Sequence, residues 1–224
     1  MEQREYEQMG IHENYYWWHV GKNLLLEVLL NKFFNNKKGN MEILEVGCGT
    51  GSILETLSKW GNIAGLDISS KAVEASRHRG FQNVICEDLL QYNTDTKYDL
   101  IVAMDVLEHI QEDVGALKKI HSLLKPNGKI IISVPVHKFL WSSRDEALHH
   151  KRRYHKVEIK QKIIDSSFKI LQGSYFVFAM FFPITIILTL DTLFRRKPYP
   201  EATYIELPTV LNKLANGNYI CNRS

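Results

Sequence analysis

The chain has 224 residues, of which 45% are hydrophobic and 24% charged, so it can bury one sizeable core without needing a second domain. Its formal net charge of +3 decides little by itself, but its three widely spaced cysteines form no C-x-x-C pair, which argues against a disulfide framework and a zinc site. From the cysteines we therefore predict no bound metal and a reducing, cytoplasmic location. Secretion is also disfavoured, since the first ten residues carry charges where a signal peptide needs an apolar stretch.

The first 40 residues combine aromatic side chains with a helical pattern. An aromatic cluster, Tyr15–His19, leads into an apolar helical stretch over residues 24–34. Two interpretations are equally open: the aromatics dock the helix on the rest of the protein, or they form a lid over a ligand. We treat residues 1–40 as this N-terminal segment.

A glycine-rich turn follows the first apolar strand. Residues 43–57 read ILEVGCGTGSILETL, in which Gly47, Gly49 and Gly51 permit a tight turn that lets a ligand approach the backbone. Glu45 adds a carboxylate at the end of the strand. A dinucleotide fingerprint needs a further glycine at the position of Ser52, so a nicotinamide-dependent oxidoreductase is the weaker interpretation.

Apolar runs and helical patterns alternate beyond this turn. This order predicts an α/β fold with a mostly parallel sheet that is covered by helices on both faces. Strands are expected at 41–46, 62–67, 83–87, 98–103, 129–134 and 168–174, with a helix at 113–124 and a turn at 125–128.

Residues 45–51 resemble the first motif of the class I S-adenosylmethionine-dependent methyltransferases, and three further matches follow in order: Asp67, Asp88 and residues 104–109. The resemblance implies their Rossmann-like fold, with the glycine turn under the methionine part, Asp67 at the ribose and Asp88 at the adenine. Each Asp has an alternative role as a helix cap, and Cys48 as a small filler. The cofactor-binding residues implied are Trp18, Glu45, Gly47, Cys48, Gly49, Gly51, Asp67, Ile68, Asp88, Leu89, Asp105 and Val106.

A second distinctive segment follows the fifth expected strand. Residues 140–154 resemble an L-W-S-x-x-D-x-x-x-x-H-x-R-R-Y signature of a bacterial subgroup of these enzymes, many of which are encoded among genes for surface glycans, lipids or secondary metabolites. The residues expected to bind the acceptor are Trp141, Arg152, Arg153 and Tyr154. Because the basic residues form one short cluster, a nucleic-acid partner is disfavoured.

Three residues are candidates for catalysis. A neutral histidine can accept a hydroxyl proton near pH 7, so we expect His150 to be the base and Asp145 to orient it. His109, after the fourth motif, is the alternative base. Positioning without any base is a third possibility.

The C-terminal region, residues 175–224, begins with an apolar stretch over 175–194 that contains Pro183. It is open to three interpretations: a pocket-lining helix, a membrane-surface element, or a membrane span. Residues 198–224 contain no convincing candidate for the family's seventh strand, so that strand is uncertain.

The division expected is therefore a segment at 1–40, a cofactor-binding core at 41–174 and a C-terminal region at 175–224. The activity implied is S-adenosylmethionine-dependent O-methylation of a small, amphipathic or lipid- or glycan-linked acceptor, releasing S-adenosylhomocysteine. The enzyme is expected in the cytoplasm, with peripheral attachment to the inner face of the membrane as an option. The alternative is a non-catalytic, membrane-associated accessory protein that binds the cofactor.

Overall fold

A computed structural model describes residues 16–175, apart from the side chains of Trp17 and Ser143. The strands are β1 (Met41–Val46), β2 (Gly61–Asp67), β3 (Val84–Cys86), β4 (Tyr98–Met104) and β5 (Leu124–Ser133). The α-helices are α2 (Trp17–Phe34), α3 (Ser52–Ser58), α4 (Ser70–His78), α5 (Asp113–Leu123), α6 (Ser143–Ala147) and α7 (Lys156–Asp165). Short 3-10 helices are η1 (Asn35–Lys37), η2 (Leu107–His109) and η3 (Lys138–Leu140).

The strands form one sheet in the order β3-β2-β1-β4-β5, and every pairing is parallel. The chain moves outward from β1 to β3 and then returns to β4 beside β1, so the strand order reverses between β1 and β4. In such sheets, ligands bind outside the carboxyl ends of the strands at this reversal. The predicted α/β, Rossmann-like fold is confirmed.

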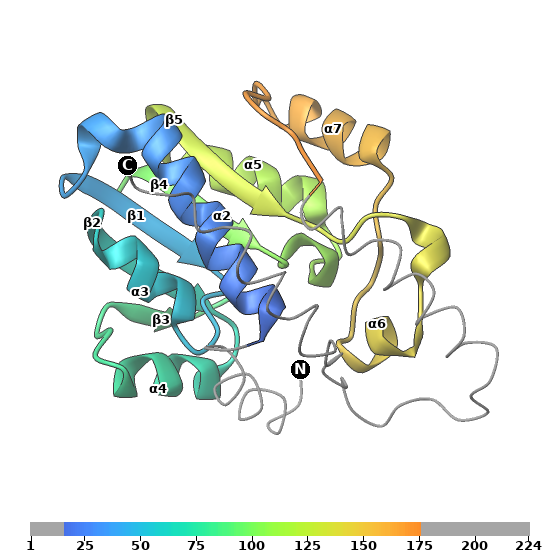
Figure 1. The fold of residues 1–224 in the computed structure, drawn as a ribbon, viewed down its shortest axis with the longest axis horizontal. Helices are drawn as coiled ribbons and strands as arrows, with labels where there is room; N and C mark the ends of the chain where they lie inside the picture. The colour runs from blue at the N-terminus through green and yellow to red at the C-terminus, as the bar shows by residue number, and fades with distance from the viewer. Residues whose placement is uncertain (1–15, 176–224) are drawn as a thin grey trace, which may run out of the picture.

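Helices cover both faces of the sheet because its central strands are apolar on both sides. Side chains of β1 and β4 alternate: Met41, Ile43, Leu100 and Val102 pack with Leu26 and other residues of α2 and α3. Leu44 and Ile101 point the other way, into a core shared with α5 and α7. Figure 1 shows α2 and α3 in front of the sheet and α5 behind it.

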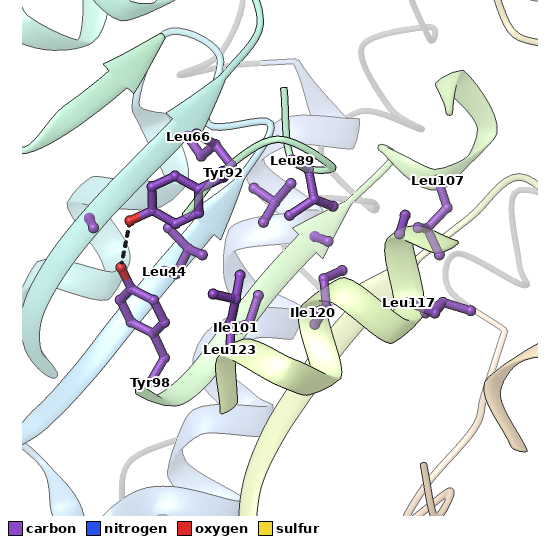
Figure 2. Close-up of a cluster of buried hydrophobic side chains, with 14 of the residues drawn as sticks. Leu44, Leu66, Leu89, Tyr92, Tyr98, Ile101, Leu107, Leu117, Ile120 and Leu123 are labelled. Atoms are coloured by element: carbon purple, nitrogen blue, oxygen red, sulfur yellow. Dashed lines mark hydrogen bonds between the residues drawn. The ribbon is translucent and has the colours of Figure 1, made fainter. Parts of the chain in front are cut away.

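The core on the α5 side contains one polar pair. The hydroxyl groups of Tyr92 and Tyr98 lie 2.9 Å apart and form a hydrogen bond with each other (Figure 2). Both side chains are buried among aliphatic residues, where an unpaired hydroxyl would cost free energy. Burial first, and then the hydrogen bond with Tyr92, raise the pKa of Tyr98. The pair therefore closes this core without leaving either hydroxyl unsatisfied.

Two predicted elements differ from the structure. The predicted sixth strand at 168–174 is wrong: the chain turns at Ser167, where φ is 69°, and residues 168–175 pair with none of the strands that the structure describes. The predicted turn at 125–128 lies within β5, as an irregularity between the pairs Tyr98–Leu124 and Leu100–Lys129, with Asn127 at φ 63°. Turn residues thus interrupt the pairing without ending the strand.

The predicted apolar segment 175–194 lies almost wholly outside the described residues. Only its first residue, Tyr175, is described, and it is 40% exposed. Among the helices within residues 16–175, none is long and apolar enough to cross a membrane. The three interpretations of this segment, and the question of a seventh strand, stay open.

A buried carboxylate at the start of β4 provides a prediction about acid stability. Asp99 is 8% exposed and accepts hydrogen bonds from Lys125 Nζ (2.7 Å), Lys37 Nζ (2.9 Å) and the Glu42 backbone N–H (3.1 Å). Burial alone would raise the pKa of Asp99, but the two lysines and the backbone donor lower it to about 2. A lowered pKa contributes stability above the unfolded value near 4, which is lost as pH falls through 4 towards 2.

We expect Asp99→Asn to lower the free energy of unfolding by about 1–2 kcal/mol at pH 7, since both lysines are partly solvated and screened. Urea unfolding at pH 7 and at pH 3 checks this, because the difference from the wild type should shrink at the lower pH. Asp95→Asn, at an exposed position, is the matched control. An Asp99→Asn deficit that stays constant between these pH values would contradict the prediction.

Candidate active site

The turn between β1 and α3 brings the backbone to the carboxyl end of the sheet. Gly47, Gly49 and Gly51 all have positive φ, at 70°, 53° and 88°. A Cβ at Gly47 would lie 2.5 Å from Val106 Cγ2, so this position requires glycine for both conformation and space. The turn is therefore held close against the segment that follows β4, where Val106 lies.

Asp67, at the end of β2, fixes the shape of this turn. Its Oδ2 accepts a hydrogen bond from the Gly49 N–H and its Oδ1 one from the Ser69 N–H, both at 2.9 Å. Burial raises the pKa of Asp67 against the lowering effect of these two donors. The N-cap of α4 is Ser69, whose hydroxyl accepts from the Ala72 N–H, so capping does not account for Asp67.

Glu45 lies buried under the turn, and one of its oxygens has no partner. The residue is 3% exposed, and its Oε2 has no hydrogen bond within the described structure. Burial raises the pKa of Glu45 well above its ordinary value, and the charge of Asp67 adds to this, whereas nearby Lys22 opposes it. An unpaired buried oxygen is costly, which indicates a hydrogen-bond donor supplied from outside the described residues 16–175.

The other predicted cofactor residues differ in exposure. Ile68, directly after Asp67, is 72% exposed, which gives the edge of the site a bare apolar side chain. Asp88 is exposed, and its Oδ1 accepts from the Leu90 N–H at 2.8 Å, a local bond that leaves its other oxygen open. Leu89 and Cys48 are buried and pack in the hydrophobic cores. Cys48 thus lies beneath the turn as a filler.

The first turns of α2 contact the segment after β4. Trp18 Nε1 and Lys22 Nζ donate to Asp105 Oδ2 at 3.2 and 3.1 Å, and Ser133 Oγ donates to its Oδ1 at 2.6 Å. Asp105 itself has φ 59°, an unusual backbone conformation for this residue. Burial would raise the pKa of Asp105, but Lys22 and these donors lower it. The structure therefore docks α2 on the sheet and also places its N-terminal end at the site.

Lys22 provides a second prediction. Its side chain is 11% exposed, pairs with Asp105 and lies near Glu45 and Glu108, whose negative charges it offsets. We expect Lys22→Met to lower the free energy of unfolding by about 2 kcal/mol, because it leaves the partly buried Asp105 carboxylate without its ion-pair partner. Chemical denaturation measures this. Lys59→Met, which removes an exposed ion pair with Glu27, is the control and should cost less than about 0.5 kcal/mol; equal losses would contradict the assignment.

The loop after β5 places a histidine, a carboxylate and an arginine together. Asp145 is 1% exposed, and its Oδ1 lies 2.9 Å from His150 Nδ1 and accepts from Arg153 Nε at 2.7 Å. Its Oδ2 accepts from the backbone N–H and the hydroxyl of Ser142. Burial would raise the pKa of Asp145, but the bonds from His150 and Arg153 lower it to about 2. The predicted pairing of Asp145 with His150 is present.

Three of the four predicted acceptor-binding residues have partners within the protein. Tyr154 is fully buried and its hydroxyl donates to Leu107 O and Asp113 Oδ2. Arg152 pairs with the same Asp113 at 3.0 Å, and Arg153 with Asp145. These side chains anchor the loop. The fourth, Trp141, is 39% exposed. Phe139, two positions earlier in the sequence, is more exposed still, at 69%.

The anchored loop brings His150 to the segment after β4. The Lys151 N–H donates to Glu108 O at 2.9 Å, and the rings of His109 and His150 meet edge to face with centroids 4.8 Å apart. Burial and the neighbouring His150 lower the pKa of His109 to about 4. Burial and the charge of Asp105 raise the pKa of Glu108 well above its ordinary value. Both predicted base candidates therefore face one region.

Sequence reasoning did not identify Lys22, Ser133 or Glu108 as site residues. Lys22 had a usable signal, because it lies four residues after Trp18 and so on the same helix face. Glu108 belongs to the fourth motif but gave no reason to be singled out. Ser133 reaches Asp105 only because β5 pairs with β4.

Comparison with known proteins identifies a family over most of this region. The family described as "Methyltransferase domain" matches residues 17–169. One curated relative, the ubiquinone biosynthesis O-methyltransferase of Pasteurella multocida, is 35% identical over 109 residues, covering 41% of this chain and 45% of that protein. Another, the malonyl-[acyl-carrier protein] O-methyltransferase 1 of Ilyobacter polytropus, is 31% identical over 155 residues, covering 63% and 58%. The chain thus spans about half the length of these relatives.

Among solved structures, the magnesium protoporphyrin IX methyltransferase of Synechocystis PCC 6803, determined with bound S-adenosylhomocysteine, superposes with a TM-score of 0.56 at 20% sequence identity. The match covers 70% of this chain and 77% of that one. At this identity the likeness concerns the fold.

Proposed function

Because the chain belongs to the methyltransferase-domain family, we propose that it is an S-adenosylmethionine-dependent O-methyltransferase. The observation that carries the proposal is the buried, unpartnered Glu45 Oε2 beneath a turn of three glycines with positive φ. A donor from a ligand would satisfy this oxygen. The site residues fit the cofactor in chemistry: Glu45 leaves a buried oxygen for a donor, Asp67 and Asp88 offer carboxylate oxygens, and exposed Ile68 offers an apolar surface for the base.

S-adenosylmethionine, when bound, supplies an electrophilic methyl group on a positively charged sulfonium. The protein's part is to hold the acceptor oxygen in line with that methyl group. It also takes up the acceptor's hydroxyl proton or lets that proton pass to solvent. His150 is the proposed base: the ionised Asp145 accepts from Nδ1, so the proton of the neutral ring resides there and the lone pair at Nε2 is available. His109 is the alternative, since its ring adjoins that of His150.

We place the acceptor over the loop after β5. Trp141 and Phe139 are exposed there, at 39% and 69%, on the side of the sheet where the strands end (Figure 1 shows this loop and α6 beyond the arrowheads). Such a surface suits the apolar part of an amphipathic hydroxyl compound. The two curated relatives are both named O-methyltransferases, which supports oxygen as the methylated atom. Arg152 and Arg153, already paired with Asp113 and Asp145, are proposed to position this loop.

Calorimetric titration of the purified chain with S-adenosylmethionine and S-adenosylhomocysteine tests the cofactor, and release of S-adenosylhomocysteine in the presence of a panel of lipid-like and small phenols and alcohols tests the transfer. Micromolar binding with acceptor-dependent release is the expected result. Binding without release from any acceptor would favour the non-catalytic accessory protein instead. No binding by folded protein would overturn the proposal.

A further inference from the structure

Three metal-ligand side chains converge where η2 meets the loop after α6. Glu108 and His109 belong to η2, and His150 comes from the loop that Lys151 and Tyr154 tie to the same segment through their bonds to Glu108 O and Leu107 O. One ligand atom from each of Glu108, His109 and His150 lies within 4.8 Å of the others. No other group of three such side chains is found in residues 16–175.

No hydrogen bond from residues 16–175 accounts for the burial of the Glu108 carboxyl group. Its side chain is 0% exposed, and neither carboxyl oxygen has a hydrogen-bond partner in the described part of the chain. Two orphaned oxygens on one buried carboxyl group are a substantial cost. Lys22 and Arg153 lie near enough to influence Glu108 electrostatically, but neither makes a hydrogen bond to it. A cation bound beside Glu108 would compensate both oxygens at once.

His150 is oriented as a metal ligand usually is. Histidines that bind metals commonly donate their other ring N–H to a carboxylate, which fixes the tautomer and aims the free nitrogen. His150 Nδ1 lies 2.9 Å from Asp145 Oδ1, and Asp145 is itself held by Arg153 and Ser142. The Nε2 atom is therefore the one left for a ligand bond. His109 meets this ring edge to face, so the two imidazoles adjoin one another.

We infer that Glu108, His109 and His150 bind a divalent first-row transition ion, for which Zn²⁺ is the probe. Two imidazoles and one carboxylate suit such ions better than Mg²⁺ or Ca²⁺, which prefer oxygen ligands alone. Bonds of roughly 2.1 Å would place tetrahedral donors about 3.4 Å apart. The three ligand atoms lie within 4.8 Å of one another, so they need to approach by up to about 1.4 Å. Three protein ligands leave a coordination position open. The expectation of no metal rested on cysteine spacing and took no account of this cluster.

The inference deepens the proposed function and rests on it for its catalytic meaning. An acceptor hydroxyl that occupied the open position would have its O–H pKa lowered by the ion. The O–H bond would then break with its electron pair kept on oxygen and its proton passed to water. In the loaded protein His150 Nε2 is a ligand, so solvent takes the proton there, whereas in the metal-free protein His150 receives it.

The experiment uses the full chain, stripped with EDTA and dialysed, and titrates it with Zn²⁺ in a calorimeter. One site of micromolar affinity or tighter is expected. Glu108→Gln, which keeps the shape of the side chain, and His150→Ala should each weaken Zn²⁺ binding at least tenfold. His78→Ala is the matched control, because His78 is exposed and 3.7 Å from Glu74, and should leave the affinity unchanged. Circular dichroism verifies that each variant is folded.

A Co²⁺-loaded sample adds a readout independent of activity, since its visible spectrum should be lost in His150→Ala. The inference would be overturned if the wild type did not bind Zn²⁺. It would also be overturned if folded Glu108→Gln and His150→Ala bound Zn²⁺ as tightly as the wild type. Titration with S-adenosylhomocysteine separates the two proposals. Turnover that persists in EDTA with no Zn²⁺ site overturns only the metal site, whereas specific Zn²⁺ binding without S-adenosylhomocysteine binding overturns only the proposed function.

Discussion

Replacement of Asp67 with alanine is expected to weaken S-adenosylhomocysteine binding about a hundredfold. Two losses combine in this variant. The proposed ribose contacts disappear, each a hydrogen bond to a charged group worth about 1.5–3 kcal/mol. The Gly49 and Ser69 N–H groups also lose their acceptor, which frees the glycine turn from the end of β2.

Calorimetric titration of the wild type and of Asp67→Ala measures this effect. Asp165→Ala is the matched control, because Asp165 is exposed at the end of α7 and its carboxylate accepts a hydrogen bond from Gln161 Nε2 on the surface of the same helix. Asp67→Asn, which keeps one acceptor oxygen, should lie between the two. A folded Asp67→Ala protein that retained the wild-type affinity would contradict the placement of the ribose at this carboxylate.

Replacement of His150 with alanine is expected to lower turnover about a hundredfold with an acceptor that the wild type methylates. The loss is expected in both the metal-free and the metal-loaded protein, since the variant removes both the proposed base and a proposed metal ligand. Affinity for S-adenosylhomocysteine should change by less than roughly threefold, because the glycine turn, Glu45 and Asp67 are untouched. Asp145 keeps its bonds to Arg153 and Ser142, so the loop should stay folded.

Steady-state rates at saturating cofactor measure the loss, with His78→Ala as the surface control. Added imidazole should restore part of the rate if His150 acts as the base, and added Zn²⁺ should not restore it. An undiminished rate in His150→Ala would remove His150 from catalysis and would favour His109 or positioning alone.

Some of this architecture could be read from local patterns. The buried strands of a parallel sheet are continuous apolar runs, and residues 41–46 and 98–103 were assigned correctly on that basis. The same criterion failed at 168–174, where an apolar run exists but residues 171–175 are exposed and pair with no strand within residues 16–175. Apolar character alone does not specify a partner for the backbone.

The loop after β5 shows where sequence reasoning ended. The pairing of Asp145 with His150 was predicted, and the structure contains it. The arginines and Tyr154 were expected at the acceptor, yet the structure pairs them with Asp145, Asp113 and Leu107 O. Whether a basic side chain faces a ligand or a buried carboxylate depends on which carboxylate the fold brings to it.

The sequence by itself determined the family, the α/β order and the positions of the glycine turn, Glu45 and Asp67, because these follow from short-range patterns in which spacing dictates local geometry. Only the tertiary structure decided that Lys22 reaches Asp105 and that Glu108, His109 and His150 converge. Those contacts join β4, α2 and the loop after β5 at the reversal of strand order. Their cause is the crossing of distant segments, which no local periodicity records.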